Sequence, residues 1–296
     1  MTVFLGERGR ILLSRKGSDQ AFISLVDASD VRVDAKRFSV DFAHEQFISG
    51  DSVEITTVSG NDLNWIDHPD ADSSFTRFIH IDAAGGIRLY DSFSEAIRGA
   101  KEDAISLKTP AASQETAFRI VENDDSRCLA SVTSYQITTS RETIDLTNLG
   151  SMYRRQYESG LINGQGQIEC YWDKPGDCGD ICDGDNLYER EFSGFLARLC
   201  LRLVHGAAFH GLFYIYADET LTERSVWYES ETCIVTNVAV TVSPTQLVTA
   251  TIDFVTSGPI ALREGYIPSF VELEQNDYLV ELEGASGGRM ELENPD

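Results

Sequence analysis

Alternation of apolar and polar residues with a period of two marks the first third of the chain. It is clearest at five positions that are typical of half-buried strands: Val31, Val33, Phe38, Val40 and Phe42. Further short apolar or β-branched runs predict strands over residues 10–13, 21–25, 52–57, 75–82 and 87–90. Ser92 and Glu95 have the spacing of a capping box, which predicts a helix over residues 93 to about 100.

A helical period appears in the second half. Apolar residues recur there at spacings of three and four, on one face of a predicted amphipathic helix that Gly206 ends: Phe192, Phe195, Leu196, Leu199 and Leu203. We predict strands over residues 128–138, 167–172, 209–216, 225–228, 233–242 and 247–255, with a long polar loop over residues 139–166. Each half thus has several strands and one helix, which predicts a β-rich α+β fold.

Composition suggests where the chain divides. Residues 108–127 begin with a polar, small-residue stretch that contains Pro110, and we predict a linker region there. This gives an N-terminal β-rich domain at residues 1–107 and a second domain at residues 128–264. Residues 265–296 form an acidic C-terminal extension, which is typical of a solvated tail.

The net charge limits the classes of partner that the chain can bind. The 48 Asp and Glu residues exceed the 24 Lys and Arg residues, so the chain carries a charge of −24. Such a surface repels phosphate, which argues against tight nucleic-acid binding but suits a wall past which DNA slides. Acidity that only maintains solubility is equally compatible. The start of the sequence lacks a signal-peptide pattern, and residues 195–217 are too interrupted by charge for a membrane span, so we expect no membrane partner.

Three segments carry a resemblance to a known family. The first is RETIDLTNLG at residues 141–150, followed by aromatic and basic residues to Tyr157 and by GLING at residues 160–164. The second is the following order of strand, loop, single helix and strand. The third is CIVTNVAVTV at residues 233–242, a turn, and LVTATIDFVTSG at residues 247–258. Over residues 128 to about 261 the chain resembles the tail tube (major tail) proteins of long-tailed, siphovirus-like bacteriophages.

The resemblance implies a fold and an assembly. It implies a tail-tube-type β-barrel or sandwich with one flanking helix, and copies that form stacked, hexameric rings around a DNA channel in the tail of a virion. The protein would be made in the host bacterial cytoplasm and would contact the terminator, tip and tape-measure proteins, while DNA passes without specific binding. The loop between rings would supply subunit contacts from Arg141, Glu142, Asp145, Leu149, Tyr153, Arg154, Arg155 and Tyr157.

Metal binding, disulfide formation and catalysis are alternatives to this hypothesis. Four aspartates in an acidic insertion have the oxygen ligands that calcium prefers but lack EF-hand spacing, so we expect no metal: Asp177, Asp180, Asp183 and Asp185. Cys178 and Cys182 lack zinc spacing, and free thiols or a short bridge between these two both remain open. No nucleophile elbow, P-loop or dinucleotide motif occurs, so we predict no enzyme and no cofactor.

Two alternatives stay open. The extra N-terminal domain either decorates a tube or marks a tail-tip, distal-ring or hub component with paired tube-like domains. A calcium-dependent carbohydrate-binding or hydrolytic β-protein is the more distant alternative.

Overall fold

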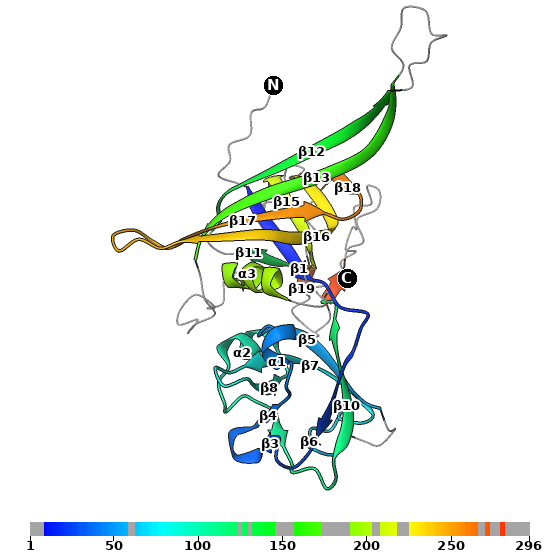
Figure 1. Cartoon of the computed structure of the whole chain (residues 1–296), viewed down its shortest axis with the longest axis vertical. Coiled ribbons are helices and arrows are strands. Elements are labelled where there is room, and N and C mark those ends of the chain that lie inside the picture. The colour runs from blue at the N-terminus through cyan, green and yellow to red at the C-terminus, as the bar shows by residue number, and fades with distance from the viewer. Residues whose placement is uncertain are drawn as a thin grey trace, which may run out of the picture.

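The computed structural model describes residues 9–58, 63–123, 126–129, 132–145, 157–172, 190–202, 208–217, 225–265, 270–272 and 279–281. Two larger sheets organise most of these residues, and Figure 1 shows one above the other. Side chains are described for most but not all of these positions, and those of residues 142–145 and 157–162 are among the exceptions.

A nine-stranded sheet forms the upper part of the molecule in Figure 1, and we call it the large sheet. Its strands follow the order β12 (Val132–Asp145), β13 (Tyr157–Tyr171), β17 (Thr249–Thr256), β16 (Ser225–Thr241), β15 (Ala208–Tyr216), β1 (Arg10–Arg15), β11 (Arg127–Leu129) and β14 (Arg190–Glu191), while β18 (Ile260–Gly265) also pairs with β16. All these pairings are antiparallel except that of β11 with β14. Helix α3 (Ser193–Leu201) packs against β16 and β17.

A seven-stranded sheet forms the lower part, which we call the small-sheet unit. Its order is β2 (Phe22–Val26), β10 (Gln114–Val121), β5 (Ser52–Thr57), β7 (Ser74–Ile81), β8 (Gly86–Tyr90), β4 (Arg37–Ser39) and β3 (Val31–Arg32). The unit also contains a 3-10 turn at Val33–Ala35, α1 (Ala43–Gln46), α2 (Phe93–Arg98) and the strand pair β6 (Ile66–Asp67) and β9 (Ser106–Leu107). A further pair, β19 (Phe270–Glu272) and β20 (Leu279–Glu281), belongs to neither sheet.

The predicted β-rich α+β class is confirmed, and so are several local elements. The Ser92 side chain accepts a hydrogen bond from the Glu95 amide, which satisfies an otherwise unpaired donor at the start of α2. Gly99 ends this helix in the left-handed region at φ 67°, where glycine has no steric penalty. The amphipathic helix is α3, and it buries Phe195, Leu196 and Leu199.

Two expectations about connections differ from the structure. The predicted linker at residues 108–127 contains β10, which lies between β2 and β5 inside the small sheet. The polar composition of residues 108–116 obscured this strand, whose burial alternates only from Gln114 onward. The N-terminal strand β1 pairs with β15 and β11 of the large sheet, so the small-sheet unit is inserted between β1 and β11 in the chain.

The predicted loop at residues 139–166 is also different. It is mostly a hairpin, because β12 and β13 pair from Val132↔Cys170 to Asp145↔Tyr157. Threonine and isoleucine are frequent in β12, and β-branched side chains favour strands even where the charge is high. The hairpin extends well beyond the rest of the large sheet (Figure 1).

A buried network of charges joins the two units. The Arg15 guanidinium, at the end of β1, donates to Glu191 of β14 through Nε at 2.7 Å and Nη2 at 2.9 Å. Its Nη1 donates to Asp51, just before β5, at 2.7 Å. Arg202 at the end of α3 donates to the other Asp51 oxygen. All four side chains are at most 3% exposed.

Aromatic rings complete this joint. The Arg15 guanidinium lies 4.2 Å from the centroid of the Phe195 ring in α3, and that of Arg127 lies 3.7 Å from the Phe93 ring in α2. The two carboxylates raise the pKa of Arg15 despite the opposing effect of burial, while burial lowers the pKa of Arg202. Both groups remain charged at neutral pH, because guanidinium does not deprotonate in proteins. The joint therefore fixes the small-sheet unit against α3.

The joint predicts a large cost for removing one partner. Arg15→Ala leaves Glu191 buried without its bidentate partner, and we expect the free energy of unfolding to fall by about 3–5 kcal/mol. Urea denaturation measures this. The control is Arg119→Ala, which breaks the more exposed pair with Glu54 and should cost less than about 1 kcal/mol. Equal losses from the two variants would contradict the assigned role of the joint.

Candidate functional site

The two faces of the large sheet differ in chemistry. The inner face packs on α3 and contributes the core residues Ile168, Cys170, Ala250, Ile252 and Phe254, with others from neighbouring strands. The opposite face of β12, β13, β17 and β16, which we call the polar face, carries mainly uncharged polar side chains. Its described members include Ser134, Gln136, Thr138, Gln165, Gln167, Thr249, Thr251, Asp253, Asn237 and Thr241. One face covered and one polar is the usual arrangement of an antiparallel sheet.

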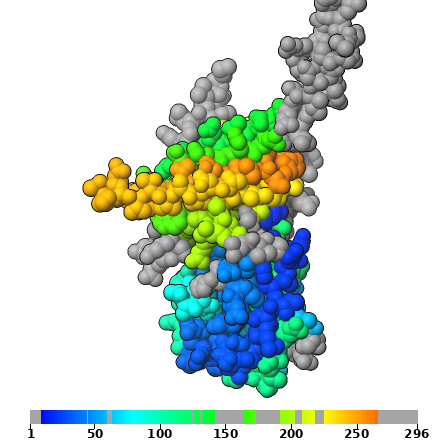
Figure 2. Space-filling view, viewed as in Figure 1, coloured from blue at the N-terminus to red at the C-terminus, as the bar shows by residue number. Residues whose placement is uncertain are grey.

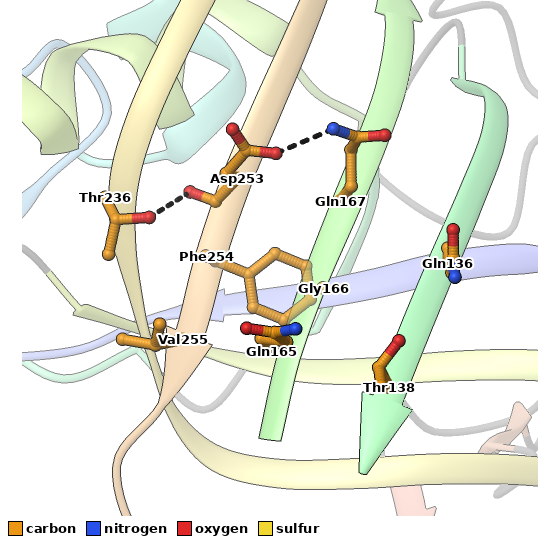
Figure 3. Close-up of a pocket in the computed structure, with 9 residues that line it drawn as sticks. All are labelled: Gln136, Thr138, Gln165, Gly166, Gln167, Thr236, Asp253, Phe254 and Val255. Carbon is orange, nitrogen blue, oxygen red and sulfur yellow. Dashed lines mark hydrogen bonds between the residues drawn. The ribbon is translucent and has the colours of Figure 1, made fainter. Parts of the chain in front are cut away.

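Asp253 is at the centre of a hydrogen-bonded row across three strands. Gln167 of β13 donates through Nε2 to Asp253 Oδ1 at 2.8 Å, and Asn237 of β16 donates through Nδ2 to Oδ2 at 2.9 Å. Figure 3 shows Gln167 and Thr236 on either side of Asp253, and the Thr236 hydroxyl donates to its carbonyl at 3.2 Å. A register shift between Val235 and Asn237 places both Thr236 and Asn237 opposite Asp253.

A shallow hollow lies in this face. It has a volume of about 310 Å³ and is lined by Gln136, Thr138, Gln165, Gly166, Gln167, Thr236, Asp253, Phe254 and Val255 (Figure 3). The close packing at Gly166 explains why this position has no side chain, because a Cβ there would lie 2.2 Å from Cζ of Phe254. The Phe254 ring stacks on Phe213 at 5.2 Å between centroids, so it cannot move aside without disturbing the core.

The electrostatics of the polar face are weakly negative. Asp253 is the single charged side chain among the residues that line the hollow. Hydrogen bonds from Asn237 and Gln167 lower its pKa, so it is ionised at neutral pH. Nearby, Ser134 donates to Glu169 Oε2 at 2.8 Å across β12 and β13. The polar face therefore presents exposed amides and hydroxyls, and its carboxylates Asp253 and Glu169 are both negative.

The predicted contact residues lie on or beyond the β12–β13 hairpin. Arg141 is exposed on β12, and the backbones of Glu142 and Asp145 continue that strand. Tyr157 begins β13 opposite Asp145. Four further predicted residues lie outside the described residues: Leu149, Tyr153, Arg154 and Arg155. Their role between subunits stays a prediction.

Most residues of the metal and thiol hypotheses lie outside the described part of the chain. The four aspartates proposed as calcium ligands, Asp177 to Asp185, and also Cys178 and Cys182 lie outside it. Within the residues that the structure describes, no group of three or more His, Cys, Asp or Glu side chains is arranged to hold a metal ion. The four described cysteines, Cys128, Cys170, Cys200 and Cys233, are free thiols. Among the described helices, none is long and apolar enough to cross a membrane.

Sequence reasoning missed one polar group that spans three strands. Ser14 Oγ of β1 lies 3.2 Å from Nδ1 of His210 in β15, and His210 Nε2 lies 3.8 Å from Glu229 Oε1 in β16. The residue types match a hydrolase triad, but the Ser14 side chain is only 4% exposed and the His–Glu separation exceeds a hydrogen bond. His210 therefore has a structural partner, and no sequence spacing signals this cross-strand contact.

Comparisons with known proteins give only distant likenesses. No family model matches the chain, and no curated protein matches it. A chain of the solved structure "Virion of native gene transfer agent (GTA) particle" has a TM-score of 0.32 and 11% identity, over 47% of this chain and 88% of that one. A chain of "Tail of empty GTA particle computed with helical refinement, C6 symmetry" has a TM-score of 0.32 and 13% identity, over 47% and 86%. Likenesses this distant do not establish a family.

The packing of Gly166 gives a direct prediction. Gly166→Ala forces the added methyl group against the Phe254 ring, and overpacking of this kind should lower the free energy of unfolding by about 1–3 kcal/mol. Chemical denaturation measures the loss. Gly265→Ala is the matched control, because its Cβ meets Trp227 at 3.4 Å, an ordinary contact. A loss as large in the control would show that the Phe254 contact is not the cause.

Two of the half-buried histidines, His80 and His210, predict how stability depends on pH. Burial lowers the pKa of His80 and of His210 from 6.5, so the folded chain binds fewer protons than the unfolded chain just below that pH. Stability is therefore fully present above pH 6.5 and falls as the pH drops through the window down to the folded values. Urea midpoints at closely spaced pH values should show this fall, and the double variant H80Q/H210Q should flatten it. An unchanged slope in the variant would contradict the assignment.

Proposed function

We propose that this chain is a structural, non-enzymatic protein of a phage-like virion tail. Its copies assemble into rings, most simply of six, that stack around a channel through which DNA passes. The single observation that carries the proposal is the polar face of the large sheet. Among the described residues, no helix lies on this face, and its side chains are mainly amides and hydroxyls. Its described charged side chains on β13 and β17 are Glu169 and Asp253, both negative, and Glu229 of β16 pairs with Arg263 of β18 at 2.8 Å.

A channel wall for DNA needs this chemistry. Lysine or arginine on the wall would bind phosphates and slow the passage of DNA, since phosphate contacts supply most non-specific affinity. A wall of amides and hydroxyls is wetted, and a few carboxylates add a weak repulsion. Asp253 is ionised at neutral pH because its two amide donors lower its pKa, so this repulsion persists under physiological conditions.

The edge of the large sheet supports self-association. Strand β12 is 14 residues long and pairs with β13 alone among the described strands. A long edge strand with free backbone donors and acceptors is a site for pairing with another chain. In a closed ring, each copy covers the edge of the next, so the ring as a whole leaves none of these edges open.

The position of the small-sheet unit agrees with this orientation. The joint places the unit beside α3, on the side of the large sheet opposite the polar face. Figure 2 shows it as a separate lobe below the large sheet. With the polar face toward the channel, the unit projects to the outside of the ring, where it decorates the tube. The β12–β13 hairpin then reaches beyond its own ring, and its residues Arg141 to Tyr157 supply contacts to the next one.

Assembly is tested by electron microscopy of the purified protein, concentrated at moderate salt. We expect hollow tubes with a regular axial repeat. Isolated rings that never stack would favour a tail-tip or distal-ring component. In that case the small-sheet unit would be the second β-rich domain of such a component. Monomers at every concentration would contradict the proposal.

The orientation of the polar face is tested by chemical labelling of the tubes. As a monomer, a Gln167→Cys variant should react with a bulky polyethylene glycol maleimide. In tubes the introduced thiol should be protected from the reagent, because a bulky reagent does not enter a narrow channel. Arg119→Cys on the small sheet is the matched control and should react in both states. Equal labelling of Cys at position 167 before and after assembly would place the polar face on the outside.

A further inference from the structure

The end of the β16–β17 hairpin is unlike the rest of the chain. Residues 236–250, TNVAVTVSPTQLVTA, contain no Asp, Glu, Lys, Arg or His, although charged residues make up 24% of the sequence. We call this segment the arm. Its outer part, from Val242 to Leu247, lies beyond the last pair that β17 forms with β13, Tyr171↔Thr249, and beyond the adjoining hydrogen bond from the Trp172 amide to the Val248 carbonyl. Figures 1 and 2 show it projecting sideways from the large sheet.

The arm presents apolar side chains to solvent. Val240, Val242 and Leu247 are 45%, 74% and 68% exposed, within one short hairpin end. Grouped apolar exposure on a projecting segment marks an interaction site rather than ordinary surface. Copies of a chain with net charge −24 repel one another, so a segment without charge is where they meet at the lowest electrostatic cost.

A receiving cavity is present on the same chain. It has a volume of about 340 Å³, lies at the joint beside α3, and is lined mainly by apolar side chains. Leu201, at 75% exposure, and Trp172, at 37%, are on its lining, and Ile97 and Ile48 of the small-sheet unit contribute from the other side. The charges on its wall are largely matched, because Arg15 and Glu191 pair with each other. Arg198 adds a positive charge, so an acidic chain is not repelled there.

We infer that the arm of one copy inserts its apolar tip, Val242 and Leu247, into the joint cavity of a neighbouring copy. The occupant is a second copy because the tip projects away from its own sheet, while the cavity lies under that sheet beside α3. This contact rests on the proposed self-assembly and names one interface of it. Since both units line the cavity, the interface forms only when the joint holds them together.

A pair of matched substitutions tests the arm. Leu247→Glu places a charge at the tip, and we expect the concentration needed for half-maximal self-association to rise at least tenfold. Leu25→Glu makes the same change at another exposed leucine, on β2 of the small-sheet unit and 59% exposed, and should change that concentration less than twofold. Circular dichroism of the monomers checks that both variants fold. Self-association of L247E at the wild-type concentration would overturn the inference.

A mixing experiment identifies the receiving surface. A Val242→Cys copy is mixed with a Leu201→Cys copy, assembled, and treated with a short bismaleimide cross-linker. We expect the mixture to give more cross-linked dimer than either variant alone. The single-variant samples measure the background from the native cysteines. Assembled rings or tubes without this dimer would overturn the inference and leave self-assembly intact. A wild-type chain that stays monomeric would remove both.

Discussion

The buried charge network at the joint is the interaction on which the arrangement of the whole molecule depends. Arg15 pairs with Glu191 inside the large sheet and with Asp51 of the small-sheet unit, and Arg202 at the end of α3 holds the second oxygen of Asp51. Such a network contributes little net stability compared with apolar packing, but leaving one member unpaired is costly. It therefore acts mainly on specificity, because a displaced small-sheet unit would leave buried charges without partners.

The joint also separates the polar face from the cavity beside α3. It places α3 and the small-sheet unit on one side of the large sheet, and no helix of the described part of the chain lies on the polar face on the other side. The polar face suits contact with water and passing DNA, while the cavity at the joint suits contact with an apolar segment. The arm and the edge strand β12 both project from the large sheet (Figure 1), and in the proposed ring they would reach neighbouring copies. Each of these features has a separate physical cause, and all of them are consistent with a ring.

Much of the fold was readable from the sequence where one period dominated. The strand at residues 52–57 and the helix capped by Ser92 appear at the expected places, because alternation and capping are local signals. The linker and the long loop were misassigned because polar composition at residues 108–116 and 139–166 outweighed the β-branched content of β10 and β12. The placement of β1 in the large sheet could not be read at all, since it depends on pairing with β15, some 200 residues later. The same holds for the joint and for the Asp253 row, whose members meet only after long-range pairing.

In the proposed assembly, the polar face of the large sheet lines the channel of a ring formed by this chain. A cryo-electron microscopy reconstruction of the assembled protein tests it most directly, because α3 and the small-sheet unit are large enough to place within each subunit. We expect β12, β13, β17 and β16 to surround an axial channel with the Gln167–Asp253–Asn237 row facing it, and the small-sheet unit to be outermost. A ring in which α3 or the small-sheet unit faces the axis, or an assembly without a channel, would contradict it.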